Sequence, residues 1–224
     1  MRSLTSYANW IGEQSLNGDL DADMDADFSI ELGGDDPVLD FPWKDPNGRV
    51  SYVDVKRHPD LLTQIDEAER FRELKELLRT LNSPRSRVET AKCDAWMTQE
   101  LNVEEEIYEA SHKFSSYVDI VFSRTENERS SQRLLFSAHQ RFADKLVKLL
   151  RLAPNTSTAA EICVRRCYFE EADGIQDGFY FTLYVSGYGC DESSARQKWG
   201  VGLRLLGNAI LQLSAGDEFA NDRD

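Results

Sequence analysis

The second half of the chain carries the same predicted order of elements twice, strand, strand, helix, and no other feature constrains the fold as much. The first unit runs from about Glu89 to Arg151 and the second from Glu161 to Leu213. Apolar residues alternate in the same phase in both units, 63 positions apart: Val118, Ile120, Phe122 and Phe181, Leu183, Val185. Because strand side chains point alternately to the two faces of a sheet, both strands would bury the same face. The sequence therefore predicts an antiparallel sheet of two ββα units, related by internal duplication or only by element order.

A short strand and a long helix are predicted before these units. Apolar residues recur at helical spacing from Pro59 until Asn82, Ser83 and Pro84 end the pattern. The resulting α+β order, βαββαββα, resembles that of duplicated ligand-binding domains of the gyrase-inhibitor kind. This resemblance is one of element order alone, without a shared motif. Three glycines interrupt the last helix, which we expect where another backbone packs closely against it: Gly200, Gly202 and Gly207.

Composition divides the chain into three parts. Residues 1–48 hold 11 acidic and 2 basic side chains, which gives −9 of the total charge of −14, and we expect an acidic, proline-rich arm there. Its alternating acids from Asp19 to Asp27 lack the glycine and glutamate positions of a calcium-binding loop. Phe41 and Trp43 are expected to attach the arm to the core. Residues 49–215 form the single predicted domain (49–87 strand and helix, 88–152 and 160–214 the two units), and 216–224 an acidic tail.

The charge and the cysteines limit the classes of function. A strongly acidic chain is repelled by phosphate backbones and anionic lipid, so we expect neither nucleic-acid nor membrane binding. With no segment resembling a secretory signal or a membrane span, a cytoplasmic protein is expected. The four cysteines lack the close pairs of zinc sites, which predicts reduced thiols and no metal or other cofactor: Cys93, Cys163, Cys167 and Cys190.

No recognised catalytic motif is present, and none of the three histidines lies in a known signature. We therefore expect no catalytic residues and a protein that is not an enzyme. The alternative is an enzyme of unknown class whose polar cleft uses Asp94, Asp119 and Arg166.

The face of the predicted sheet that points away from the helices, called the second face below, is a better candidate for function than a catalytic cleft. If the apolar alternates face the helices, their neighbours form a surface of aromatic rings and opposite charges. Such a surface can bind a protein partner or a small ligand, or can simply cover an antiparallel sheet; a homodimer is also possible. Seven residues are the predicted binding residues: Asp94, Trp96, Asp119, Arg166, Tyr168, Tyr180 and Tyr184. Three others share the predicted face: Lys92, Tyr117 and Thr182.

Overall fold

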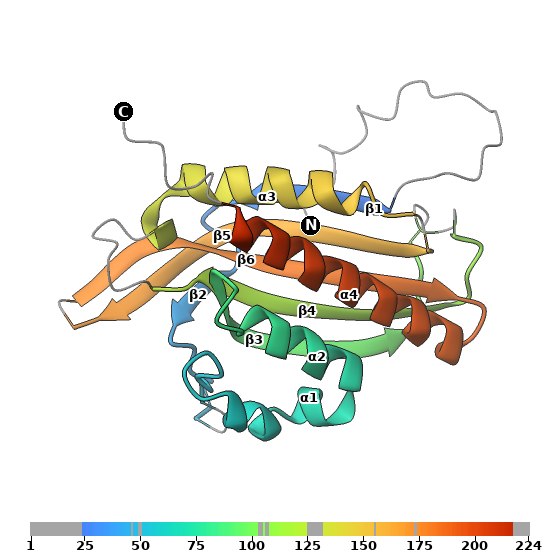
Figure 1. The fold of residues 1–224 in the computed structure, drawn as a ribbon, viewed down its shortest axis with the longest axis horizontal. Coiled ribbons are helices and arrows are strands. Elements are labelled where there is room, and N and C mark those ends of the chain that lie inside the picture. The colour runs from blue at the N-terminus through green and yellow to red at the C-terminus, as the bar shows by residue number, and fades with distance from the viewer. Residues whose placement is uncertain are drawn as a thin grey trace.

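The protein is an α+β structure with one six-stranded sheet backed by helices (Figure 1). The computed structural model describes residues 24–45, 47–48, 51–102, 105, 108–124, 132–154, 156–172 and 174–216. Most of the predicted N-terminal acidic run and nearly all of the C-terminal tail lie outside these residues. The strands are β1 (Asp25–Glu31), β2 (Val38–Phe41), β3 (Val88–Thr98), β4 (His112–Phe122), β5 (Thr158–Glu171) and β6 (Gly174–Gly189). The helices are η1 (Pro59–Gln64), α1 (Asp66–Arg70), α2 (Arg72–Leu81), η3 (Gln132–Leu134), α3 (Phe136–Leu150) and α4 (Glu192–Ala215).

The sheet has the order β1-β5-β6-β4-β3 and is mostly antiparallel. Both hairpins, β3–β4 and β5–β6, pair antiparallel, as does β4 with β6. β1 pairs in parallel with residues 159–165 of β5, and β2 pairs in parallel with residues 166–169 further along the same edge. The region predicted as an N-terminal arm therefore contributes two strands to the sheet, and Met24 and Ala26 are buried in the core.

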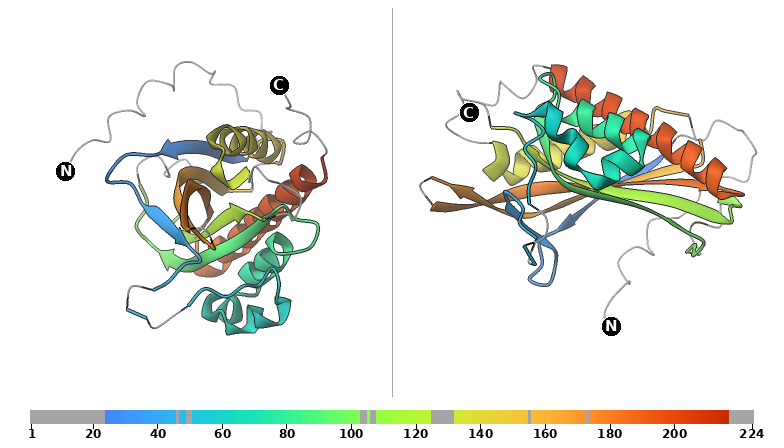
Figure 2. Two further views of the ribbon diagram at one scale, coloured as in Figure 1. Left: turned by 90° about the vertical axis from the view of Figure 1, so that its left-hand side faces the viewer. Right: turned by 90° about the horizontal axis from the view of Figure 1, so that it is seen from below.

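The helices cover one face of the twisted sheet, as both views in Figure 2 make visible. The apolar alternates Val118, Ile120, Phe181 and Leu183 are all buried in the core that these helices share with the sheet. α4 lies along β6, and its Trp199 is fully buried beside Phe71 and Phe114. This face therefore supplies most of the hydrophobic core.

Two glycines of β6 allow α4 to pack so closely. A Cβ atom at Gly187 would lie 2.1 Å from the backbone nitrogen of Trp199, and one at Gly189 would lie 2.4 Å from that of Ala195. The glycines inside α4 have a different environment, because Gly200, Gly202 and Gly207 face side chains. The close approach expected for the helix glycines is thus made by the glycines of the facing strand.

The structure does not support the predicted internal duplication. β3 and β4 have 11 residues each, whereas β5 and β6 have 14 and 16, and α3 has 15 residues against 24 in α4. The single long helix predicted after Pro59 is divided into η1, α1 and α2, because the extended backbone of Ile65 and Phe71 interrupts it. The ββα order is shared, but the two units differ in size and in their neighbours.

Within the part of the chain that the structure describes, covering contacts lie at the two ends of the second face of the sheet, the face opposite the helices. At one end Phe41, Trp43 and Tyr52 pack on a small core, and the Arg133 guanidinium lies 5.4 Å from the Phe41 ring centroid. At the other end Tyr108 stacks on Tyr188 with a centroid distance of 4.0 Å, and the Tyr188 hydroxyl donates to Glu105 at 2.8 Å. A central strip lies between these two covers.

Among the described residues, no helix combines the length and the apolar character that a membrane crossing requires.

Candidate functional site on the second face of the sheet

Two cross-strand rows of side chains occupy the central strip. The aromatic row runs over β3, β4 and β6 and comprises Trp96, Tyr117 and Tyr184. The ionic row runs parallel to it from β3 to β1 and comprises Lys92, Asp119, Thr182, Arg165 and Glu31. Both rows exist because residues of one phase on neighbouring strands lie side by side.

The aromatic row offers a nearly continuous apolar surface. Ring centroids lie 6.3 Å apart between Trp96 and Tyr117 and 6.2 Å apart between Tyr117 and Tyr184. Trp96 is 40% exposed, which is unusual for so large an apolar side chain. Its neighbours Tyr117 and Tyr184 are half-buried. The row therefore presents one exposed ring supported by two more fixed ones.

The ionic row is held by a continuous series of contacts. The Thr182 hydroxyl donates to the Asp119 carboxylate at 2.6 Å and accepts from the Arg165 guanidinium at 2.8 Å. Arg165 also donates to Glu31 at 2.7 Å and to the Tyr184 hydroxyl at 3.3 Å, which links the two rows. Lys92 lies 3.5 Å from the other oxygen of Asp119. These contacts satisfy the buried charges and hold the side chains of the ionic row in place.

Burial changes the pKa values of side chains in both rows. It raises the pKa of the Asp119 carboxyl, although the hydrogen bond from Thr182 and the charges of Lys92 and Arg165 act in the opposite direction. Burial lowers the pKa of Arg165, but its bonds to Tyr184 and Glu31 outweigh burial and hold that pKa above the ordinary value. Burial and the nearby acids Asp119 and Asp94 raise the pKa of Tyr117. The Tyr117 hydroxyl is therefore neutral at pH 7.

The structure brings together four of the seven predicted binding residues, namely Asp94, Trp96, Asp119 and Tyr184. Tyr180 lies on the same face but is 2% exposed, in the small core under Phe41. Burial raises its pKa to about 12. Tyr180 therefore serves packing at this position.

Arg166 and Tyr168 are corrections to the prediction, because they lie on the opposite face. In the register of β5 with β6, Arg165 is paired with Tyr180, whereas Arg166 is paired with Phe179. The alternation predicted for β5 is therefore wrong by one residue. Arg165 faces the central strip in place of Arg166. The apolar residues Ile162 and Val164, which face the helical core, are a weak sequence signal for this phase, because the intervening Cys163 is buried as well.

Asp94 protects the edge of the sheet as well as adding charge to the strip. β3 is the edge strand at this side, and the Asp94 carboxylate accepts a hydrogen bond from the Ala95 backbone N–H at 2.7 Å. Asp27 makes the same 2.7 Å contact with the Phe28 N–H on β1, at the other edge. Carboxylates that occupy edge donors discourage the unspecific addition of a further strand.

Among the described residues, one group of side chains has atoms spaced for a metal ion. The ligand atoms of Glu31, Glu161 and Cys163 all lie within 4.8 Å of one another. Glu31 already accepts from Arg165, and burial raises the pKa of the Cys163 thiol to about 12. A metal would have to displace Arg165 and a proton, so these residues fit a metal poorly.

The three residues of the enzymatic alternative do not form a common cleft. Asp119 is enclosed in the ionic row, while Arg166 lies on the other side of the sheet from Asp94 and Asp119. Two hollows, of about 350 and 160 Å³, lie between α3 and α4 and between α2 and α4, on the helical side. Neither of these hollows lies on the central strip.

Comparisons with protein-family models, with curated proteins and with solved structures found no match for this chain.

Proposed function

We propose that the central strip of the second face binds an extended segment of a protein partner, without catalysis. The observation that carries this proposal is the exposure of Trp96 at the end of an ordered aromatic row, between two ends of the face that the chain itself covers. Large, rigid rings contribute much of the energy at protein interfaces when a partner excludes water from them.

The strip is already organised for binding. Thr182 and Asp119 are buried and hydrogen-bonded to each other, and Arg165 is held from both sides. A surface whose side chains are fixed in advance loses little conformational entropy on association. This order supports recognition by a preformed surface over recognition by rearrangement.

The charges of the strip favour a partner with basic side chains. Lys92 and Arg165 are neutralised by Asp119 and Glu31 within the ionic row. Asp94 and Glu161, both exposed, join no salt bridge within the described part of the chain. A lysine or arginine of the partner would therefore meet these acids and could lie over the Trp96 ring, the aromatic ring that binds cations best.

The experiment is a selection of random peptides on the immobilised protein, followed by mapping of the bound peptide by two-dimensional NMR. We expect the selected sequences to be enriched in lysine and arginine. Their binding should shift the Trp96 indole signal and the signals of Tyr117 and Tyr184. Failure to select any peptide, or shifts confined to the helical side, would overturn the proposal. If the strip binds a small molecule instead, added metabolites should shift the same NMR signals and added peptides should not.

A further inference from the structure

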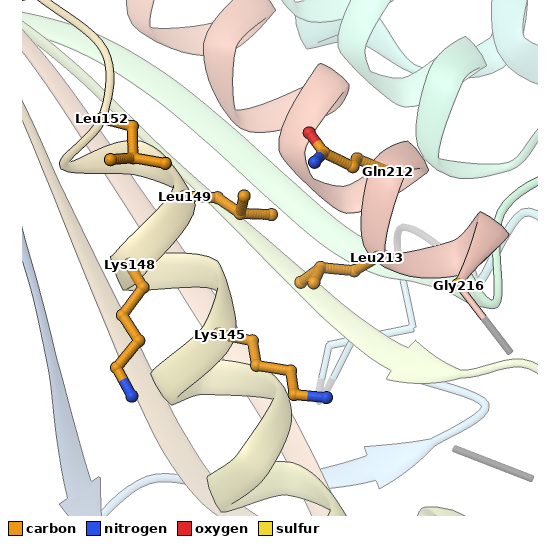
Figure 3. A pocket seen from close by; sticks show the side chains of 7 residues that line it. All are labelled: Lys145, Lys148, Leu149, Leu152, Gln212, Leu213 and Gly216. Atoms are coloured by element: carbon orange, nitrogen blue, oxygen red, sulfur yellow. The ribbon is translucent and has the colours of Figure 1, made fainter. Parts of the chain in front are cut away.

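A groove with an apolar floor lies between α3 and the last turns of α4 (Figure 3). Its volume is about 350 Å³, and Leu149 and Leu213 face each other across it. Leu152 extends the floor and is 80% exposed. Lys145 and Lys148 follow one wall along α3. Leu149 and Leu213 are half-buried, so the groove combines partly covered leucines, one exposed leucine and bordering lysines, which together suit an amphipathic helix.

We propose that residues 4–16 of this same chain form an amphipathic helix that docks in this groove. Its sequence, LTSYANWIGEQSL, places large apolar residues at helical spacing, and Gly18 follows shortly after as a stop signal. The apolar positions fall within one arc of a helix: Leu4, Tyr7, Ala8, Trp10 and Ile11.

The chain enters the described structure beside this groove. The Met24 backbone N–H donates to the Ala153 carbonyl at 2.8 Å, next to Leu152 on the groove floor. Residues 17–23 connect this point to the proposed helix and can span at most about 25 Å. The stretch from Lys145 on α3 to Leu152, two residues past the end of this helix, is only about 10 Å long, at about 1.5 Å per residue. The proposed helix can therefore reverse direction and lie along the groove.

Charge complementarity supports the same occupant. The connecting residues carry Asp19, Asp21 and Asp23, whereas Lys145 and Lys148 border the groove. Lys148 already pairs with Asp144 at 2.7 Å, but the Lys148 side chain is 72% exposed and can approach a second carboxylate. A tethered segment also binds at a high effective concentration, so weak contacts suffice.

The C-terminal residues offer a weaker alternative. They leave the fold at Gly216, which lines the groove, but they contribute only one large apolar side chain, Phe219. Residues 4–16 provide several such side chains on one face.

The test uses the full chain with labelled leucine methyl groups. In the double variant Trp10→Ala/Ile11→Ala we expect the methyl signals of Leu149, Leu152 and Leu213 to shift, because the Trp10 ring no longer lies over them. The control variant Thr5→Ala/Asn9→Ala changes the opposite side of the segment and should leave these signals in place. Reversal of both lysine charges, Lys145→Glu/Lys148→Glu, should speed amide hydrogen exchange in residues 4–16.

Unchanged leucine signals in the Trp10→Ala/Ile11→Ala variant would overturn the proposal. It would also be overturned if Phe219→Ala moved the signals instead, which assigns the groove to the C-terminal segment. A dependence of the wild-type signals on protein concentration would assign the groove to a second copy of the chain and overturn the proposal in the same way.

Discussion

The two faces of the sheet are built from alternate residues of the same strands, yet they differ in nearly every physical property. On the helical face Val118 and Phe181 are enclosed by apolar side chains. One residue further along each strand, Asp119 and Thr182 are equally buried but lie in a hydrogen-bonded ionic row. This contrast teaches that burial alone does not distinguish the helical face from the second face, to which we assign binding as a proposal. The two faces differ in that the second one exposes a large ring, Trp96, supported by its neighbours.

The largest expected effect is on the helical face, at Trp199. This side chain is fully buried, contacts Phe71 and Phe114, and donates from its indole nitrogen to the Ser116 hydroxyl at 2.8 Å. The substitution Trp199→Ala should lower the free energy of unfolding by about 3–5 kcal/mol. Urea denaturation followed by circular dichroism measures this change. A loss below about 1 kcal/mol would show that α4 does not depend on this contact.

Within the ionic row of the second face, Asp119 should be the position most important for stability. Asp119→Ala leaves the Thr182 hydroxyl and Lys92 without their acceptor, which should cost about 1–3 kcal/mol. Asp119→Asn keeps an acceptor for Thr182 and removes the cost of burying a charge, so it should cost less. Equal losses in the two variants, measured by urea denaturation, would contradict the hydrogen-bonded description of the ionic row.

The helical face should also carry a dependence on pH, through His139. Burial lowers the pKa of His139 from 6.5 to about 4, and its ring lies against Phe122 and Phe181. The unfolded chain therefore binds this proton before the folded chain does as the pH falls. Between pH 7 and pH 5 the folded state should lose about 2 kcal/mol through this group.

The replacement His139→Phe isolates this contribution. The variant should lose about 2 kcal/mol less than the wild type between pH 7 and pH 5, when both are unfolded in urea. An identical loss in the two proteins would mean that His139 takes up its proton as readily in the folded chain as in the unfolded chain.

The smallest effect on stability is expected at Trp96. Because this side chain is 40% exposed and contacts mainly Tyr117, Trp96→Ala should cost about 1 kcal/mol or less. The loss of free energy of unfolding in Trp96→Ala, set against the loss in Trp199→Ala, compares the same substitution on the two faces. A loss at Trp96 as large as that at Trp199 would make the aromatic row part of the core.

Regular alternation explains how much of the fold could be predicted. The apolar phase is regular from Val118 to Phe122 on β4 and from Phe179 to Val185 on β6, so the buried set and the antiparallel hairpins follow from the sequence. β5 is less informative, because the consecutive residues 162–165 are all buried and their apolar periodicity is weak. This is the strand on which Arg165 and Arg166 were exchanged.

Long-range pairing accounts for the features that could not be predicted. β1 and β2 join the sheet by parallel pairing with β5, more than 100 residues away, and no local pattern indicates this partner. On β3 a bulge between Thr90 and Lys92 changes which residues face the central strip. Trp96 and Asp94 were placed on the correct face, whereas Tyr180 was expected at the surface because its cover, Phe41, comes from a distant segment.

The most direct test of the central claim compares two aromatic residues of similar exposure on opposite faces. Trp96 is 40% exposed within the aromatic row, and Tyr168 is 37% exposed on the other face of β5. With a peptide selected on the wild-type protein, Trp96→Ala should raise the Kd by about 30-fold, which corresponds to about 2 kcal/mol, and Tyr168→Ala should leave it within about twofold. Equal weakening in both variants, or no weakening in Trp96→Ala, would contradict the assignment of recognition to the second face.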